Sequence, residues 1–167
     1  MSKKSDLGSS EGLQPNDLRS LIDETDHRIL EVLAVEARIP NNALAERVGI
    51  APSTCLGRVR ALMERGVIRG FYADINPDAV GYALQAIVAV RLQVDARDVM
   101  HTFAARLADI AEVRDVFFIA GAHDFFVHMV AHDTAQLRQF VMDLGASPEV
   151  ASTETNVILE HLHVQRL

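Results

Sequence analysis

The sequence predicts an α+β protein in which a helical domain precedes a domain of alternating strands and helices. Two observations lead to this fold class: apolar residues recur at helical spacing between positions 23 and 66, and strand-like apolar runs alternate with helical stretches between positions 84 and 164. The length of 167 residues fits one large domain or two small ones. We therefore expect two domains, each with its own core.

Composition narrows the class of protein. The chain is 49% hydrophobic and 23% charged, as folded globular proteins are. No apolar run approaches the roughly 20 residues that a membrane helix needs, and the first ten residues lack the apolar centre of a signal peptide, so we expect a cytoplasmic protein. Cys55 is the only cysteine, which excludes an intramolecular disulfide and a cysteine-rich metal site.

The chain divides into four segments. Residues 1–17 are rich in Ser, Gly and Lys, and we expect them to form a disordered tail. Residues 18–72 form the helical domain, residues 73–83 a linker, and residues 84–167 the second domain.

The first domain is expected to begin with two helices, of which the second is very short. One spans about Glu24 to Ala37, and Asp23 with Asp26 resembles a capping box at its start. Asn41 is expected to cap the next helix, which ends at Gly49.

A third helix follows almost at once. Pro52 suits its first position and Gly66 its end, and its apolar face is formed by Cys55, Val59 and Leu62. The β-branched and aromatic residues of 67–75 predict a strand or short hairpin, and 76–78 predict a turn.

The second domain has the predicted order strand, helix, strand, strand, helix, strand, over residues 84–94, 96–107, 113–120, 125–131, 134–144 and 152–164. This order matches a ferredoxin-like βαββαβ fold, whose two helices cover one face of an antiparallel sheet. Strands 84–90 and 113–120 carry apolar residues at both odd and even positions, so both of their faces are apolar. We therefore expect a sheet-to-sheet homodimer to cover the other face.

The short helix before Gly49 and the helix after it have the spacing of a helix-turn-helix. Ala45 is small where the helices cross, Gly49 allows the positive φ of the turn, and Ile50 fills the shared core. Such a motif places its second helix in the major groove of double-stranded DNA. Arg58 is the foremost candidate for a base or phosphate contact, and the candidate contacts together are Asn41, Asn42, Ser53, Thr54, Gly57, Arg58 and Arg60.

Charge is distributed unevenly along the chain. The net charge is −7, yet residues 41–72 carry five arginines against two glutamates, a net charge of +3, and residues 84–167 carry a net charge of −5. A basic surface that binds a polyanion is therefore compatible with an acidic chain. The alternatives are chance clustering and a structural three-helix unit whose arginines are only solvated.

Several strings resemble the leucine-responsive and asparagine-responsive (Lrp/AsnC) family of bacterial and archaeal transcription regulators. They are LIDETDHRIL at 21–30, LAERVGIAPSTCLGRVRALMERGVIRGFYADINPDAVGY at 44–82, AGAHDFF at 120–126 and STETNVIL at 152–159. The resemblance implies an N-terminal winged helix-turn-helix, a connecting strand, and a ferredoxin-like domain that dimerises, assembles into octamers and binds small effectors, usually amino acids. Ala51 and Gly57 depart from the family, in which many members have a capping residue and a larger, often basic, residue.

The resemblance also implies an effector pocket between dimers, near a hairpin and the start of the last strand. The residues at these positions are Gly121, Ala122, His123, Asp124, Ser152, Thr153 and Thr155. Asp124 can accept from the ammonium of an amino acid, and Ser152 or Thr155 can donate to its carboxylate. The alternative is a hairpin whose Gly and Asp serve the turn alone.

Metal binding and catalysis receive little support. The seven histidines include no HExxH string, and no Ser, His and Asp set has the spacing of a catalytic motif. We expect no cofactor, no metal and no enzymatic activity. The predicted function is a DNA-binding regulator that responds to a small effector, usually an amino acid, through its assembly. The alternatives are an effector-independent architectural DNA-binding protein and a small metal-binding or catalytic ferredoxin-like protein.

Overall fold

The computed structural model describes residues 22–162, except for the side chain of Arg97. These residues form two compact units, 22–73 and 74–162. The tail expected at 1–17 and the last residues of the strand expected at 152–164 lie outside the described part of the chain.

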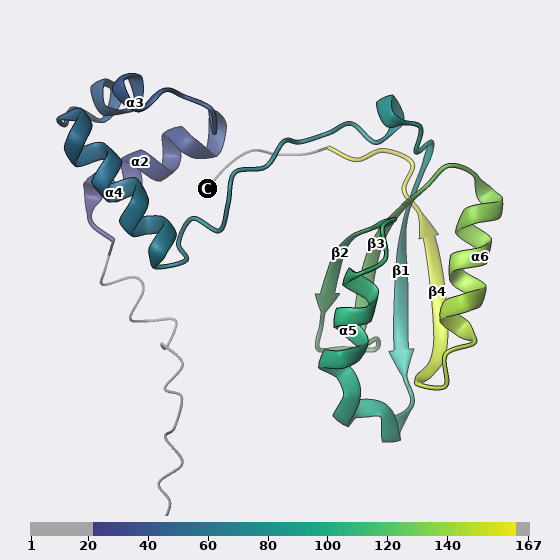
Figure 1. Cartoon of the computed structure of the whole chain (residues 1–167). Helices are drawn as coiled ribbons and strands as arrows, with labels where there is room; N and C mark the ends of the chain where they lie inside the picture. Colours follow the sequence, from purple (N-terminus) through teal and green to yellow (C-terminus); the bar gives the residue numbers. More distant parts are fainter. Residues whose placement is uncertain (1–21, 163–167) are drawn as a thin grey trace, which may run out of the picture. The chain divides into compact units, whose positions relative to one another are not determined.

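The first unit contains three helices in the described residues, α2 (Glu24–Val35), α3 (Asn41–Val48) and α4 (Pro52–Glu64) (Figure 1). The capping box at Asp23 and Asp26 is confirmed. The apolar faces of the helices meet in a core that contains Ile29, Ile39, Leu44, Ala45, Val48, Cys55 and Leu62. The first helix ends two residues before the expected end, because Glu36 has left the helical conformation at φ −129° and ψ 72°.

The turn between α3 and α4 has the expected geometry. Gly49 has φ +73° and ψ 36°. This left-handed conformation is energetically unfavourable for any residue that has a Cβ atom. The N–H of Ile50 donates to the carbonyl of Ala45 at 3.0 Å, and Ile50 packs against the core. Together these contacts place α4 directly after the tight turn of a helix-turn-helix.

Two expectations for this unit are wrong. Asn41 does not cap α3: the cap position is Pro40, whose extended backbone starts the helix one residue earlier, so Asn41 is already helical. Residues 67–75 do not form a strand in the described chain, because no described strand pairs with them. Instead, the N–H groups of Val67 and Ile68 both donate to the carbonyl of Leu62, at 2.9 and 3.1 Å, and satisfy the end of α4.

The second unit is a four-stranded antiparallel sheet with two α-helices on one face (Figure 1). A short 3₁₀ helix, η1 (Asp78–Val80), precedes the first strand. The remaining elements are β1 (Leu84–Leu92), η2 (Val94–Val99), α5 (Met100–Ala108), β2 (Val113–Phe118), β3 (Phe125–Ala131), α6 (Thr134–Gly145) and β4 (Val150–Val157). The strand order is β2-β3-β1-β4, and the predicted βαββαβ order is confirmed.

Some boundaries differ from those expected. The helix expected from residue 96 begins as α-helix only at Met100, because residues 94–99 form the tighter η2 helix. The last strand begins at Val150, two residues early, and within the described residues it ends at Val157.

The two faces of the sheet have different environments. On the helix-covered face, Val88, Val90, Phe125 and Val127 are at most 1% exposed. On the other face, the register aligns Ala89 with Phe126 of β3, and Phe126 with Phe117 of β2. Phe117 is 51% exposed and Phe126 is 36% exposed. We call this surface the open sheet face. It presents apolar groups that α5 and α6 do not cover.

Candidate nucleic-acid interface and effector site

The side chains of α4 form three stripes along the helix. The first, which includes Cys55 and Leu62, is buried in the core, and burial raises the pKa of the Cys55 thiol. Its cysteine therefore stays protonated at neutral pH and serves packing. The second stripe is exposed and carries Ser53, Gly57 and Arg60.

The exposed stripe offers hydrogen-bond donors of the kinds that suit nucleic acids. The N-cap of α4 is Ala51, which supplies no side-chain acceptor, so backbone N–H groups at this helix start stay available for another acceptor. Ser53 and Thr54 present hydroxyls, and Arg60 makes no ion pair within the described residues. Hydroxyls and a guanidinium suit both phosphates and base edges.

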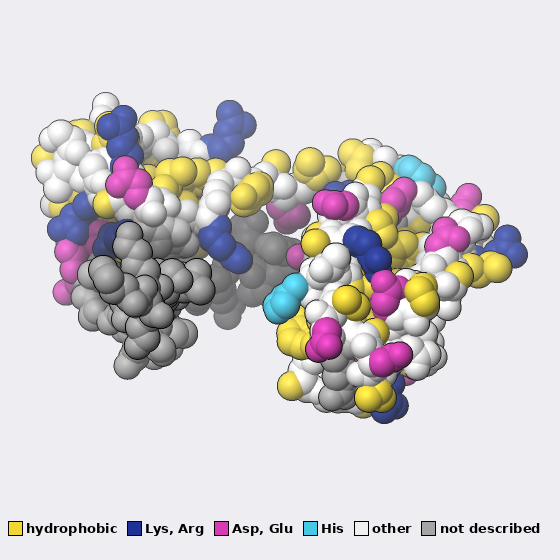
Figure 2. Space-filling model, turned by 60° about the horizontal axis from the view of Figure 1, so that its bottom comes forward, with side chains coloured by type: hydrophobic (Ala, Val, Ile, Leu, Met, Phe, Trp, Pro, Cys, Tyr) yellow, Lys and Arg dark blue, Asp and Glu magenta, His cyan; other side chains and the backbone are white. Residues whose placement is uncertain are grey.

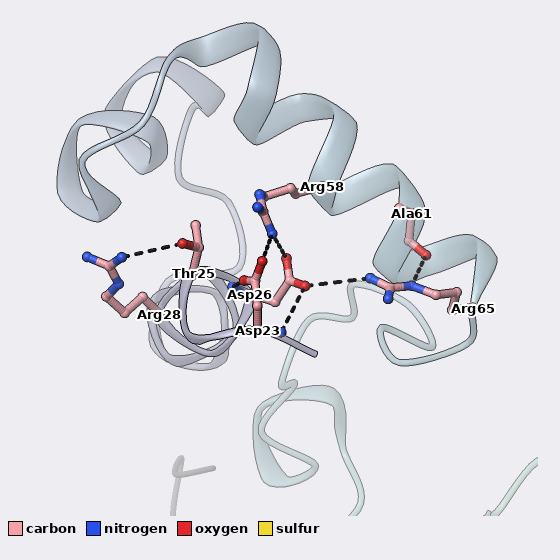
Figure 3. Close-up of polar contacts among 7 residues, drawn as sticks. All are labelled: Asp23, Thr25, Asp26, Arg28, Arg58, Ala61 and Arg65. Carbon is pink, nitrogen blue, oxygen red and sulfur yellow. Dashed lines mark hydrogen bonds and ion pairs between the residues drawn. The ribbon is translucent and has the colours of Figure 1, made fainter. Parts of the chain in front are cut away.

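The third stripe of α4 faces the start of α2 (Figure 3). Nη1 of Arg58 donates to Oδ2 of Asp23 at 2.6 Å and to Oδ1 of Asp26 at 2.9 Å. Nη2 of Arg65 lies 3.7 Å from Oδ2 of Asp26. We call these four residues the carboxylate clamp. Asp26 is the buried member, with a side chain that is 5% exposed.

Hydrogen bonds in the clamp shift two pKa values. The N–H of Asp26, followed by the guanidinium of Arg58, lowers the pKa of the Asp23 carboxyl. The same pairing, with Asp26 contributing most, raises the pKa of Arg58. Arg58 and Asp23 therefore stay charged throughout the neutral range.

The predicted DNA contacts lie in different surroundings. Ser53, Thr54, Gly57, Arg60 and Asn42 are exposed. Nδ2 of Asn41 donates to the carbonyl of Pro52 at 2.9 Å and joins the starts of α3 and α4. Arg58, the foremost sequence candidate, is instead bound to two carboxylates. Sequence reasoning missed Asp26 as its partner, because the two residues are 32 positions apart and only the packing of α2 on α4 brings them together.

The predicted effector residues gather near one end of the sheet. Asp124 is a structural anchor there: its Oδ2 accepts from the N–H of Leu92 at 2.8 Å, and its own N–H donates to Val90 at 2.9 Å. Gly121 and Ala122 are exposed in the same hairpin. A Cβ built on Gly121 meets no atom within 4 Å, so this unit's own packing does not require glycine there.

The residues of β4 lie on different faces of the sheet. The register pairs Thr153 with Val90 and Thr155 with Val88, on the helix-covered side, whereas Ser152 pairs with Arg91 on the other side. Nε2 of His123, in the hairpin, lies 3.8 Å from Oε2 of Glu154. The hairpin therefore neighbours the start of β4, but the three hydroxyls do not point to one spot within the unit.

Sequence reasoning missed a cavity of about 530 Å³ between α5 and α6. Phe103, Leu107, Met129 and Leu144 line its apolar part, and none of the predicted effector residues contributes to it. Apolar residues at helical spacing predict a core, and they carry no signal for a gap between two helices.

Comparison with known proteins settles the class of this chain. Residues 22–69 match the sequence model of the winged helix-turn-helix DNA-binding domain, and residues 85–166 match that of the Lrp/AsnC ligand binding domain. The transcriptional regulator AldR of Mycolicibacterium smegmatis is 54% identical over 89% of this chain and 88% of its own length. The leucine-responsive regulatory protein of Rhizobium meliloti is 38% identical over 87% and 94%.

The chain belongs to the Lrp/AsnC family. Solved members have the same fold. The crystal structure of MtbAldR is 50% identical, with a TM-score of 0.74 over 86% of this chain and 98% of that one. A Neisseria meningitidis regulator in complex with L-Met is 31% identical, with a TM-score of 0.79 over 86% and 94%. A feast or famine regulatory protein from M. tuberculosis, complexed with L-methionine, is 30% identical, with a TM-score of 0.79 over 87% and 97%.

Membership of the Lrp/AsnC family makes this chain a transcriptional regulator with a DNA-binding domain and a ligand-binding domain, and not an enzyme. No helix among residues 22–162 is long and apolar enough to cross a membrane. In that same range, no three His, Cys, Asp or Glu side chains are grouped to hold a metal ion. Figure 2 shows Asp and Glu side chains spread over the visible face of the second unit, among hydrophobic ones.

Proposed function

We propose that this regulator binds an amino acid in its second domain and responds through a change of homo-oligomeric assembly. The observation that carries the proposal is the open sheet face, where Phe117 and Phe126 remain exposed beside the buried Ala89. Large apolar side chains that are exposed on a sheet face are costly in water, and a second copy of the same face can cover them. The homodimer would then be the unit from which octamers assemble.

On DNA, the recognition helix is α4. We assign the contacts to its exposed residues and to the start of α3: Asn41, Asn42, Ser53, Thr54, Gly57 and Arg60. Gly57 presents only backbone, so it allows close approach to a base or phosphate. One helix makes too few contacts for tight specific binding, and a dimer adds a second helix one turn of the duplex away.

The amino-acid pocket is assigned to the hairpin 121–124 together with Ser152, Thr153 and Thr155. Oδ2 of Asp124 is used within the domain, whereas its Oδ1 has no partner among the described residues and is available to an ammonium group. Because the hydroxyls of β4 lie on both faces and do not meet at the hairpin, we assign the remainder of the pocket to a second dimer. The two solved relatives with L-methionine support an amino acid as ligand.

Such control has a thermodynamic requirement. A ligand shifts an assembly equilibrium only if it binds one assembly more tightly than the other. A pocket completed between dimers meets this requirement, because the dissociated dimer holds only part of it.

The test is a thermal-shift screen of the full chain against the twenty amino acids, followed by light scattering. A ligand present at a hundred times its dissociation constant stabilises the folded state by about 2.7 kcal/mol. We expect at least one amino acid to raise the midpoint and to change the particle mass. If none does either, the effector proposal is wrong and the chain acts as an effector-independent architectural protein.

A further inference from the structure

The carboxylate clamp joins the start of α2 to two positions, one within α4 and one at its end. Arg58 in α4 and Arg65, which caps the end of this helix, are seven residues apart, a separation of about 10 Å along the helix axis. Both guanidinium groups converge on Asp26, near the start of α2, and Asp23 also binds Arg58 (Figure 3). The hydrogen bonds from Arg58 are directional, and the ion pair from Arg65 attaches a second position of the helix to the same carboxylate, so together they restrict the sliding and the tilt of α4 against α2.

We propose that Asp26 is a positioning residue for DNA recognition, which holds the recognition helix through Arg58 and Arg65. Arg58 then serves the position of α4 and does not contact phosphate. The inference rests on the proposed DNA-contact face of α4. It adds the residue that aims this face, on a helix that carries none of the proposed contacts.

Burial of Asp26 disfavours the transfer of Arg58 from the carboxylate clamp to a DNA phosphate. A phosphate that captured Arg58 would remove from Asp26, whose side chain is only 5% exposed, its closest cationic partner. A buried carboxylate that loses a charged partner is strongly destabilised, whereas Arg60 is exposed and has no carboxylate partner to lose among the described residues. Phosphate contact is therefore assigned to Arg60.

The apolar core alone does not set the angle of α4 with the same accuracy. Cys55 and Leu62 pack through dispersion forces, which are non-directional. Base recognition depends on hydrogen bonds that weaken steeply outside a narrow range of distance and angle. A small tilt of α4 would displace Ser53 and Arg60 from base edges, while long flexible side chains would still reach phosphates.

This difference defines the experiment. The full chain first selects a preferred duplex from a random-sequence library, and affinities are then measured for that duplex and for an unselected random duplex over a series of salt concentrations. The variant Asp26→Asn keeps the shape of the side chain and removes its charge. The matched control Glu24→Gln removes one negative charge from an exposed position in the same helical turn.

We expect Asp26→Asn to weaken binding of the selected duplex by about tenfold or more and binding of the random duplex by less than about twofold. The slope of log affinity against log salt should not change. Arg58→Ala should give the same pattern, and Arg58→Lys, which keeps a cation at the clamp, should recover part of the specificity. Glu24→Gln should preserve the ratio between the two duplexes.

Other outcomes overturn the proposal. If Arg58→Ala reduces the salt slope by about 0.9 and weakens both duplexes equally, Arg58 is a phosphate contact. If folded Asp26→Asn weakens both equally, the clamp only maintains the fold. Circular dichroism checks folding, and should Asp26→Asn unfold, Arg58→Lys decides through the same ratio. Arg60→Ala tests the proposed DNA-contact face separately, because an unchanged slope there contradicts that face and not the role of Asp26.

Discussion

The same Gly→Ala substitution should have opposite effects at two positions of the DNA-binding unit. At Gly49, φ is +73°, and a Cβ placed there meets no other atom within 4 Å. The effect of Gly49→Ala therefore comes from the unfavourable left-handed backbone conformation, and it destabilises the unit by about 1–2 kcal/mol. Gly57 lies inside α4 without a positive φ, and its Cβ position is equally open. Alanine there should stabilise the unit by about 0.5–1 kcal/mol.

The two variants should therefore differ by roughly 1.5–3 kcal/mol in the free energy of opening the first unit. Amide hydrogen exchange in α3 and α4 measures this quantity without requiring the two units to unfold together. Wild-type chain under the same conditions is the reference. If both variants shift exchange in the same direction, backbone conformation does not govern the turn and the argument for Gly49 is refuted.

Three further predictions concern the second unit. Phe125→Ala should destabilise it by about 3–5 kcal/mol in urea unfolding, because Phe125 is 1% exposed, whereas Phe126→Ala, at 36% exposed, should cost clearly less; equal losses would contradict the assigned faces. Hydrogen bonds from Ser147 and then Arg106 lower the pKa of the Glu149 carboxyl to about 2. The stability that ionised Glu149 contributes to the fold is therefore complete above its unperturbed pKa near 4.5 and is lost as the pH falls towards 2. Arg106→Ala should raise this pKa in an NMR titration, and no rise would exclude the ion pair in solution. Asp124→Asn keeps an acceptor for the N–H of Leu92 and should preserve the fold but weaken amino-acid binding, as calorimetry would show; unchanged affinity would remove Asp124 from the pocket.

Some features of this protein follow from local sequence patterns. The capping box of α2, the positive φ of Gly49 and the buried stripe of Cys55 and Leu62 each depend on residues within a few positions of one another. The order of elements in the second unit was predictable for the same reason, because periods of 2 and 3.6 are visible in a short window. The apolar residues at both odd and even positions of β1 likewise indicate that both faces of this strand need to be buried.

Other features depend on partners that are distant in sequence. The strand expected at 67–75 does not form, because a segment with high β-propensity becomes a strand only where another strand pairs with it. The described residues provide no such partner. The sequence indicates Asp124 as a candidate ligand, and only the fold shows that one of its oxygens also accepts from the N–H of Leu92, 32 residues away.

The sequence by itself determined the family, the two domains and the helix-turn-helix, because these follow from local periodicity and from strings of adjacent residues. Only the tertiary structure decided which groups of the domain Arg58 binds. Its carboxylate partners, 35 and 32 residues earlier, become neighbours when α2 packs on α4. A guanidinium binds whichever anion the fold brings within about 3 Å, and that choice depends on long-range packing that one-dimensional spacing does not encode.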